Sequence, residues 1–376
     1  MSQDARMLDV AGLEAVLDLL SGRGYVLLGP TVRDGAVVLS RITSIEDLPA
    51  GVRDEQAPGR YRLESAGDGL LFGFAATAAS WKPFLFPARR TLWELGADGL
   101  PEQPDADRTR RAFVGVRACD LHAIGVLDDV LAARPFADPD YAARREGIFV
   151  IAVTCAHPGG TCFCTSMGTG PRPDSGFDIA LTEIMDAGGH RFLAQQGSAA
   201  GAGVLADVPG RAVTRSDEQA AAAVATAASE AMRRGVDTEG LRDVLYAVAE
   251  HPRWDDVAAR CLSCGNCTLV CPTCFCVTTR EVVDLSGRVG RDREWDSCFD
   301  PDHSHLHGGP VRGTTRTRYR QWLTHKFASW IDQFGTSGCV GCGRCVTWCP
   351  VGIDVREELA ALRDTSTKEE FDGRPA

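Results

Sequence analysis

The sequence predicts an α/β N-terminal domain followed by a smaller, mostly helical domain. Three observations support this prediction. A strand–helix–strand order in the first half indicates a parallel pair of strands joined by a helix. In the last quarter one spacing of cysteines occurs twice, and an amphipathic helical pattern lies between the two copies. We expect the α/β domain over residues 1–250, the second domain over 251–365 and a flexible tail over 366–376.

Composition indicates a globular protein of a reducing compartment. With 376 residues, 44% of them hydrophobic, the chain can bury a core. Residues 1–6 are not followed by an apolar signal segment, and the longest apolar run, 148–153, is too short to span a bilayer. We therefore expect a cytoplasmic protein without a membrane span, whose fifteen cysteines are metal ligands rather than disulfides. The net charge of -11 argues against nucleic-acid binding and favours soluble redox or protein partners.

The first elements expected along the chain are a helix and a hairpin. Residues 9–20 form an amphipathic helical pattern whose apolar face carries Leu13, Val16, Leu17 and Leu20. Two strands follow at 25–28 and 36–42, around the turn sequence Arg33-Asp34-Gly35. A further strand is expected near 61–64, within a segment rich in proline, glycine and charge.

Residues 81–87 form an aromatic patch bracketed by prolines, which we expect not to be regular helix. A packed extended segment is favoured over a partner-binding patch, because aromatic clusters of this kind are usually part of the core.

The predicted α/β core runs from residue 112 to residue 153. We expect a strand at 112–117, a helix at 120–131 and a strand at 148–153. Cys119 and Cys155 follow the two strands, at the sheet edge where sites of open α/β sheets gather. Strands at 177–185 and 191–195 and a helix near 216–233, packed over the sheet, complete this part of the chain.

The loop after Cys155 adds two more thiols at the same edge, Cys162 and Cys164. Its glycines and small residues allow the backbone to approach a prosthetic group closely. We therefore propose a third 4Fe-4S cluster held by Cys119, Cys155, Cys162 and Cys164. The alternative is a set of buried, inert thiols, because free cysteine is often buried.

The two cysteine runs carry the chemistry. Both follow the pattern C-x2-C-x2-C-x3-C-P, which is typical of dicluster ferredoxin-like domains with two 4Fe-4S clusters. Three thiolates of one short loop reach three corners of a cube, and the fourth crosses to the other cube. One predicted quartet is Cys261, Cys264, Cys267 and Cys349; the other is Cys339, Cys342, Cys345 and Cys271. Zinc knuckles and disulfides are the alternatives, but zinc sites do not need the third cysteine or the terminal Cys-Pro.

The insert between the runs, residues 273–338, contains the amphipathic helix. The helix has an apolar face whose residues recur at three- and four-residue steps. They are Tyr319, Trp322, Leu323, Phe327, Trp330, Ile331 and Phe334, and Gly335 follows where a left-handed cap is expected.

The insert also contains a basic cluster made of Arg312, Arg316, Arg318, Arg320 and Lys326. This cluster either stabilises a reduced iron–sulfur cluster, docks an acidic partner or forms a solvated face. His303, His305 and His307 fit a polar loop near a subunit interface better than a metal site. Cys274, Cys276 and Cys298 remain unassigned, and any of them is an alternative ligand for the third cluster.

No motif for substrate chemistry accompanies these cysteines. The sequence has no dinucleotide-binding fingerprint, phosphate loop or nucleophile elbow. A chain that holds only one-electron centres is expected to transfer electrons between other subunits.

The cysteine runs, together with residues 115–120, 158–164 and 316–327, resemble one family over nearly the whole chain. It is that of the β subunits of cytoplasmic NAD(P)-linked NiFe hydrogenases (sulfhydrogenases), with the electron-transfer subunit of anaerobic sulfite reductase as a relative. The resemblance implies an electron-transfer subunit. Its expected partners are a flavoprotein subunit that binds FAD and NAD(P) and the small and large subunits of a NiFe hydrogenase. The alternatives are service to a sulfite reductase, a flavin-binding oxidoreductase subunit, and a structural cluster protein.

Overall fold

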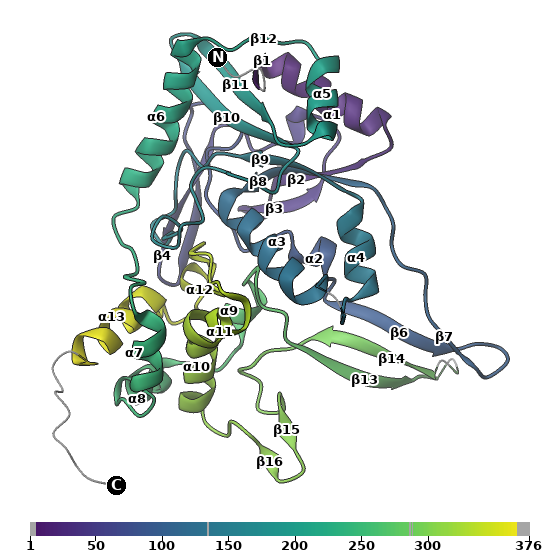
Figure 1. Cartoon of the computed structure of the whole chain (residues 1–376), viewed down its shortest axis with the longest axis vertical. Helices are drawn as coiled ribbons and strands as arrows, with labels where there is room; N and C mark the ends of the chain where they lie inside the picture. Colours follow the sequence, from purple (N-terminus) through teal and green to yellow (C-terminus); the bar gives the residue numbers. More distant parts are fainter. Residues whose placement is uncertain (1–4, 134, 286, 288, 367–376) are drawn as a thin grey trace.

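The computed structural model describes residues 5–133, 135–285, 287 and 289–366. Its largest element is a mixed, eight-stranded sheet with helices on both faces (Figure 1). The central strands β2, β8, β9 and β10 are parallel neighbours, which confirms the predicted parallel pair at 112–117 and 148–153. In sheet order the strands are β12 (Arg211–Ala212), β1 (Ala5–Asp9), β11 (Gly189–Gln196), β10 (Ile179–Asp186), β9 (Ile148–Val153), β8 (Arg111–Arg117), β2 (Val26–Arg33) and β3 (Ala36–Arg41).

Residues of β9 alternate between two cores, one on each face of the sheet. Phe149 and Ile151 pack with α1 (Val10–Gly22) and α5 (Ala199–Asp207). Val150 and Ala152 pack with α3 (Ala118–Leu131) and α4 (Pro139–Glu146). Successive side chains of a strand point to opposite faces, so a strand covered on both faces is apolar throughout. The N-terminal region therefore contains the multi-stranded sheet covered by helices that the sequence predicts.

The other expected N-terminal elements are present. The predicted apolar face of α1 is buried, and Asp9 caps the helix by accepting a hydrogen bond from the Gly12 amide. The turn between β2 and β3 is made by Asp34 and Gly35, both with positive φ. Helix α6 (Arg215–Ala231) packs against β10 and β11, as expected for the alanine-rich segment.

One prediction for this region is wrong. Residues 81–87 include a single helical turn, α2 (Lys82–Leu85), where a non-helical segment was expected. Pro83 lies in the first turn, where a missing N–H removes no helical hydrogen bond. Trp81, Leu85 and Phe86 are buried in the core, so the packed alternative, rather than a partner-binding patch, describes the segment.

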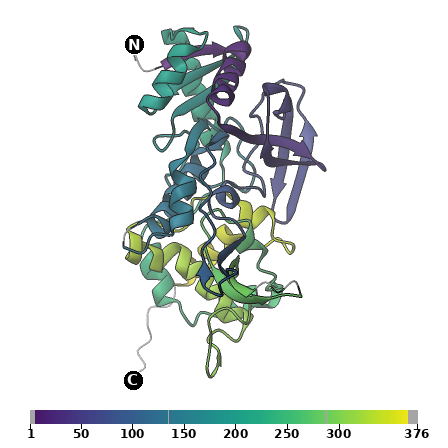
Figure 2. The ribbon, with the colours of Figure 1, turned by 90° about the vertical axis from the view of Figure 1, so that its right-hand side faces the viewer.

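A separate hairpin supports the second cysteine run. Strands β4 (Val52–Ala57) and β5 (Arg60–Ser65) include the strand expected at 61–64. Figure 2 shows this purple-to-blue part of the chain standing out on one side of the molecule. At the end of the hairpin, the Gly59 amide donates to the Val346 carbonyl, and Tyr61 stacks on Trp348 with ring centroids 5.0 Å apart. The hairpin thereby holds the loop that carries the last cysteines.

The description of the C-terminal part as mostly helical is not confirmed. Residues that follow the first cysteine run form a hairpin of β13 (Val277–Val283) and β14 (Val289–Trp295). Strand β14 also pairs with β6 (Arg89–Leu95), which in turn pairs with β7 (Pro101–Glu102), and these strands form an arm (Figure 1). The β-branched residues of β13 suit a strand, but β6, the other partner of β14, lies far away in the sequence. A smaller hairpin pairs β15 (His305–Leu306) with β16 (Gly309–Pro310).

The helix predicted in the insert is present but not uniform. It consists of α10 (Thr315–Thr324), a π-helical turn at His325–Ser329 and α11 (Trp330–Phe334), and Gly335 caps it in the left-handed conformation. The remaining helices are α7 (Leu241–Ala247), α8 (Arg253–Arg260), α9 (Asn266–Leu269), α12 (Arg344–Thr347) and α13 (Val355–Ser366). Side chains from both sides of the predicted boundary, such as Leu241 and Trp254, share one core with α10 and α13. The domain boundary at residues 250 and 251 stays a prediction.

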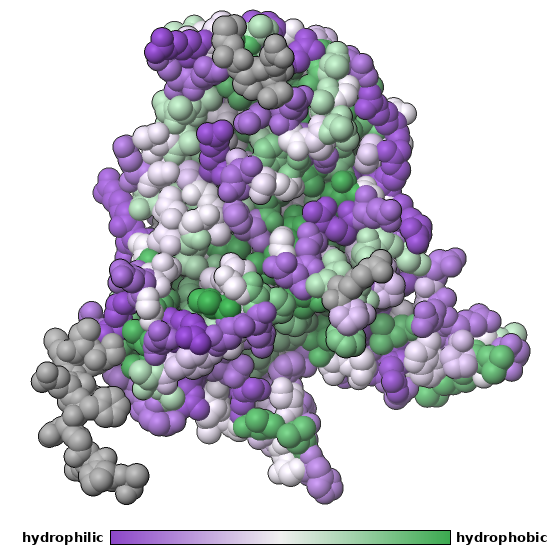
Figure 3. All heavy atoms as spheres, viewed as in Figure 1, coloured by the Kyte–Doolittle hydropathy of each residue, from purple (hydrophilic) through white to green (hydrophobic). Residues whose placement is uncertain are grey.

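Most of the expected tail, residues 367–376, lies outside the described residues. Figure 3 shows hydrophobic residues in the middle of the face seen in Figure 1 and hydrophilic residues along its margins. In the part of the chain that the structure describes, no helix combines the length and apolarity needed to cross a bilayer.

Candidate iron–sulfur centres

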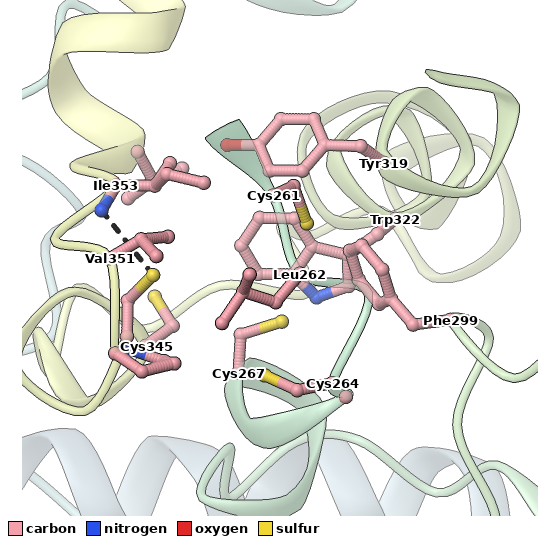
Figure 4. Close-up of a pocket in the computed structure, with 14 residues that line it drawn as sticks. Cys261, Leu262, Cys264, Cys267, Phe299, Tyr319, Trp322, Cys345, Val351 and Ile353 are labelled. Carbon is pink, nitrogen blue, oxygen red and sulfur yellow. Dashed lines mark hydrogen bonds between the residues drawn. The ribbon is translucent and has the colours of Figure 1, made fainter. Parts of the chain in front are cut away.

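The first cysteine quartet lines one cavity. Cys261, Cys264 and Cys267 lie on the loop from the end of α8 into α9, and Cys349 follows α12. Figure 4 shows the labelled cysteines around this cavity, with Tyr319 and Trp322 beside them. The space between the atoms is about 470 Å³, part of it open to solvent. Leu262, Phe299, Val351 and Ile353 complete a lining that is almost entirely apolar, apart from sulfur.

The second quartet lines a neighbouring cavity, where the space between the atoms is about 400 Å³, part of it open to solvent. Cys339, Cys342 and Cys345 come from the second run, and Cys271 comes from the end of the first. The structure therefore brings together both predicted quartets, and each receives its fourth cysteine from the other run. Trp322, Cys345 and Val355 line both cavities, so the two spaces are adjacent.

The two runs have the same local conformation because their glycines allow it. Gly265 and Gly343 have φ of 72° and 75°, in the left-handed region that other residues enter at a cost. These turns place the third cysteine of each run on the short helix that follows, α9 or α12. A side chain at Gly343 would also collide with the backbone of Thr161, because its β-carbon would lie 2.5 Å from the Thr161 carbonyl oxygen.

Backbone amides point at the sulfur atoms in a repeated pattern. The Ser263 amide donates to Cys261 Sγ at 3.4 Å, and the Gly341 amide donates to Cys339 Sγ at 3.4 Å. The Ile353 amide donates to Cys349 Sγ at 3.3 Å, the dashed line in Figure 4. Such bonds stabilise negative charge on sulfur and raise the reduction potential of a metal cluster.

Two of the buried thiols, Cys339 and Cys267, are poor acids in this environment. Burial raises the pKa of Cys339 to about 12 and raises the pKa of Cys267 well above its usual range. Buried thiols of this kind remain protonated at neutral pH unless a metal takes the place of the proton. Four thiols around an apolar cavity, with amide donors aimed at the sulfurs, fit an iron–sulfur cluster in chemistry and number.

The second cavity also contains two buried cations. Arg344 forms an ion pair with Asp120 of α3, Nη1 to Oδ1 at 2.8 Å, and donates to the carbonyls of Thr77 and Ala79. Lys326, in the π-helical turn, donates to Cys271 Sγ at 3.4 Å. Among the described residues, no carboxylate forms an ion pair with Lys326. A buried ammonium without a carboxylate needs another source of negative charge, which a thiolate-ligated cluster supplies.

Three of the four cysteines of the expected third site, Cys119, Cys162 and Cys164, lie beside the second cavity. Cys155 directly follows β9, and Cys119 lies in the first turn of α3. Cys119 and Cys164 share a small apolar cluster with Val340 and Cys342. Cys162 Sγ lies 3.8 Å from the Cys342 carbonyl oxygen, and burial raises the pKa of Cys162 well above its usual range.

The structure separates the other sequence candidates by environment. In the basic cluster, Arg316 and Arg320 pair with the exposed Glu250, as on a solvated face, whereas Lys326 is buried. His303 bonds to Asp296 at 2.8 Å, while His305 and His307 are exposed, which favours the polar-loop interpretation. Within the described parts of the chain, no three His, Cys, Asp or Glu side chains are grouped as ligands of a single metal ion.

The unassigned cysteines form close pairs. Cys298 and Cys276 are hydrogen-bonded to each other, which lowers the pKa of Cys276 to about 6. Cys274 is hydrogen-bonded to Cys271, and this bond contributes most to lowering the pKa of Cys271.

Sequence reasoning did not identify Arg344, Asp120 or Lys82 as neighbours of the cavities. The rarity of lysine could have singled out two positions, since the chain contains only Lys82, Lys326 and Lys368.

Comparisons with known proteins agree with the cysteine geometry. A family model described as a 4Fe-4S dicluster domain matches residues 260–353, which include both runs. The β subunit of sulfhydrogenase 2 from Pyrococcus furiosus is 32% identical over 315 residues, covering 81% of this chain and 89% of the relative. No solved structure matches. With this degree of identity over most of both sequences, the chain belongs to the family of sulfhydrogenase β subunits.

Proposed function

We propose that this chain is the electron-transfer subunit of a hydrogenase complex, relaying electrons between an NAD(P)H-linked flavoprotein subunit and a NiFe hydrogenase catalytic unit. One observation carries the proposal: two adjacent cavities share Cys345 in their linings, and the fourth cysteine of each quartet comes from the other run. The relative's name supports the hydrogenase assignment, since it describes a sulfhydrogenase subunit.

In this proposal the ligands of the first cluster are Cys261, Cys264, Cys267 and Cys349, and those of the second are Cys271, Cys339, Cys342 and Cys345. A bound 4Fe-4S cluster supplies a centre that accepts or gives one electron. The protein's own contribution is to hold the two sites next to each other and to exclude water with Trp322, Phe299 and Phe163. The Ser263, Gly341 and Ile353 amides balance negative charge on the sulfurs.

The partners follow from what this chain does not provide for itself. Its sequence has no dinucleotide-binding fingerprint, so a separate FAD-binding subunit would exchange electrons with NAD(P)H. The small and large subunits of the NiFe hydrogenase would lie at the other end of the pathway. Fifteen cysteines, all free among the described residues, are consistent with a cytoplasmic location.

Purification of the native complex under anaerobic conditions tests this assignment. We expect nickel and FAD to co-purify with the chain, because both belong to the proposed partner subunits. Sirohaem in place of nickel would move the assignment to a sulfite reductase. FAD bound to the isolated, folded chain would instead favour the flavin-binding alternative.

A third 4Fe-4S cluster at Cys119, Cys155, Cys162 and Cys164 is part of the proposal, supported by the packing of Cys119 and Cys164 in one cluster with Cys342 and by the approach of Cys162 Sγ to the Cys342 carbonyl. Replacing Cys162 and Cys164 together with serine should then lower the iron content by about four atoms per chain, the content of one cube. Iron and acid-labile sulfide analysis measures this loss. A matched variant, Cys276→Ser with Cys298→Ser, should keep the full iron content. If the Cys162/Cys164 variant retains all its iron, the third cluster is disproved.

A further inference from the structure

The lysines of this chain are distributed unusually. Of the 40 basic residues only three are lysine, Lys82, Lys326 and Lys368. Lys82 and Lys326 are both buried, 3% and 4% exposed, although lysine is seldom fully buried. Both lie beside Cys271 and Cys274, since Lys82 Nζ donates to the Cys274 carbonyl at 3.1 Å. An ammonium is a compact point charge, unlike the planar guanidinium that the chain uses elsewhere.

Lys326 is held in place by three acceptors. Its Nζ donates to Thr273 Oγ1 at 2.6 Å, to the Gly338 carbonyl at 3.2 Å and to Cys271 Sγ at 3.4 Å. Thr273 is fixed in turn, because its hydroxyl donates to the same Gly338 carbonyl at 2.7 Å. Lys326 lies in the π-helical turn, where it and the next two residues, Phe327 and Ala328, are all buried.

The charge of Lys326 is maintained by its surroundings. Its three acceptors, Cys271 Sγ, Thr273 Oγ1 and the Gly338 carbonyl oxygen, match the three N–H donors of an ammonium. Arg344, the other cation of the second cavity, is paired with Asp120, so its charge is largely balanced. Burial lowers the pKa of Lys82, and its Nζ contacts a carbonyl and the Trp295 ring rather than a thiol.

The first cavity has no equivalent cation. No lysine or arginine is among its lining residues, which are aromatic or aliphatic apart from the cysteines, Gly265 and Pro350. Arg318 contributes least among the causes of the pKa shift of Cys261. Its Nη1 donates a hydrogen bond to the Arg312 carbonyl oxygen, whereas Lys326 donates directly to a cysteine sulfur. Both cavities have amide donors to sulfur, so the main electrostatic difference between them is the ammonium at Cys271.

We propose that Lys326 raises the reduction potential of the second cluster above that of the first, so that an electron shared by the pair resides at the Cys271, Cys339, Cys342 and Cys345 site. This rests on the proposed function, because it requires both clusters. The physical reason is that reduction adds a negative charge to the cluster, and a fixed positive charge at 3.4 Å from a ligand sulfur stabilises the reduced form. Lys326 therefore acts through its fixed positive charge and is not a ligand of the cluster.

Redox titration followed by electron paramagnetic resonance (EPR) tests the proposal without any activity measurement. In Lys326→Met, we expect the potential of one cluster to fall and that of the other to stay unchanged. The equilibrium ratio of reduced second cluster to reduced first cluster should fall at least about tenfold, which is 59 mV for a one-electron couple. Lys326→Arg keeps the positive charge and should show a smaller shift. Lys82→Met, the matched control, should also shift the potential less, because Lys82 Nζ does not contact a thiol.

A second measurement does not depend on how well a Lys326 variant folds. Cys264→Ser, in the first quartet, should perturb the signal of the cluster with the lower potential, in a chain that retains Lys326. If it perturbs the higher-potential signal, or if Lys326→Met binds both clusters with unchanged potentials, the role of Lys326 is disproved while the proposed function stands. A folded wild-type chain without iron would instead remove the proposed function itself.

Discussion

Replacing Arg344 with methionine should lower the free energy of unfolding by roughly 3–5 kcal/mol, the usual cost of removing one partner of a buried ion pair. Arg344 is 2% exposed and Asp120 is 4% exposed, so the remaining carboxylate would be buried without a countercharge. The variant also loses the hydrogen bonds to the carbonyls of Thr77 and Ala79, which have few alternatives in the interior. The pair joins the short helix of the second cysteine run to α3 of the central sheet.

Urea unfolding under anaerobic conditions measures this effect, with tryptophan fluorescence and iron release as independent probes. Adding Asp120→Asn to Arg344→Met should recover part of the loss, because the uncompensated charge is then removed. Arg23→Met is a matched control, since Arg23 pairs with Asp207 at the surface, and it should change the unfolding midpoint little. Equal stability of Arg344→Met and the wild type would show that the pair does not join the two regions.

Short-range patterns predicted much of the fold. The apolar face of α1, the turn at Asp34 and Gly35, and the strand–helix–strand unit from β8 to β9 all depend on neighbouring residues, and each is present. The grouping of Cys349 with the first run and of Cys271 with the second was also predictable, because a short loop cannot supply the fourth corner of its own cube.

Long-range pairing was not predictable in the same way. Strand β14 pairs with β6, almost two hundred residues earlier, and no local pattern in residues 289–295 indicates that strand. The expectation of a mostly helical C-terminal part came from the strong pattern at residues 319–334, which outweighed the weaker strand pattern of β13. The turn α2 was missed because Pro83 was taken to exclude a helix, whereas proline is tolerated in a first turn.

The environment of the cysteines required the three-dimensional structure. In the sequence Lys326 belongs to a cluster of arginines, but the structure separates it from the Arg316 and Arg320 ion pairs with exposed Glu250. The π-helical turn in which it is buried has no clear signature in residues 325–329. Asp120 and Arg344 are more than two hundred residues apart in the sequence, so their pairing could not be inferred from either position.

Exchange of the fourth cysteine between the two runs is the central claim. If it is correct, Cys271→Ala should alter the same EPR signal as Cys342→Ala, because both side chains line the second cavity. Cys349→Ala should alter the same signal as Cys264→Ala, because both line the first. Each variant loses one of four ligands, so we expect severe loss or conversion of one cluster while the other is retained.

Cys274→Ala provides the matched control, since Cys274 follows Cys271 closely in the chain but lines neither cavity. The decisive measurement is the set of EPR spectra of these five variants, reduced under anaerobic conditions. We predict that Cys271→Ala and Cys342→Ala lose one signal, that Cys349→Ala and Cys264→Ala lose the other, and that Cys274→Ala keeps both. Loss of the same signal from Cys271→Ala and Cys264→Ala, two cysteines of one run, would contradict the exchange.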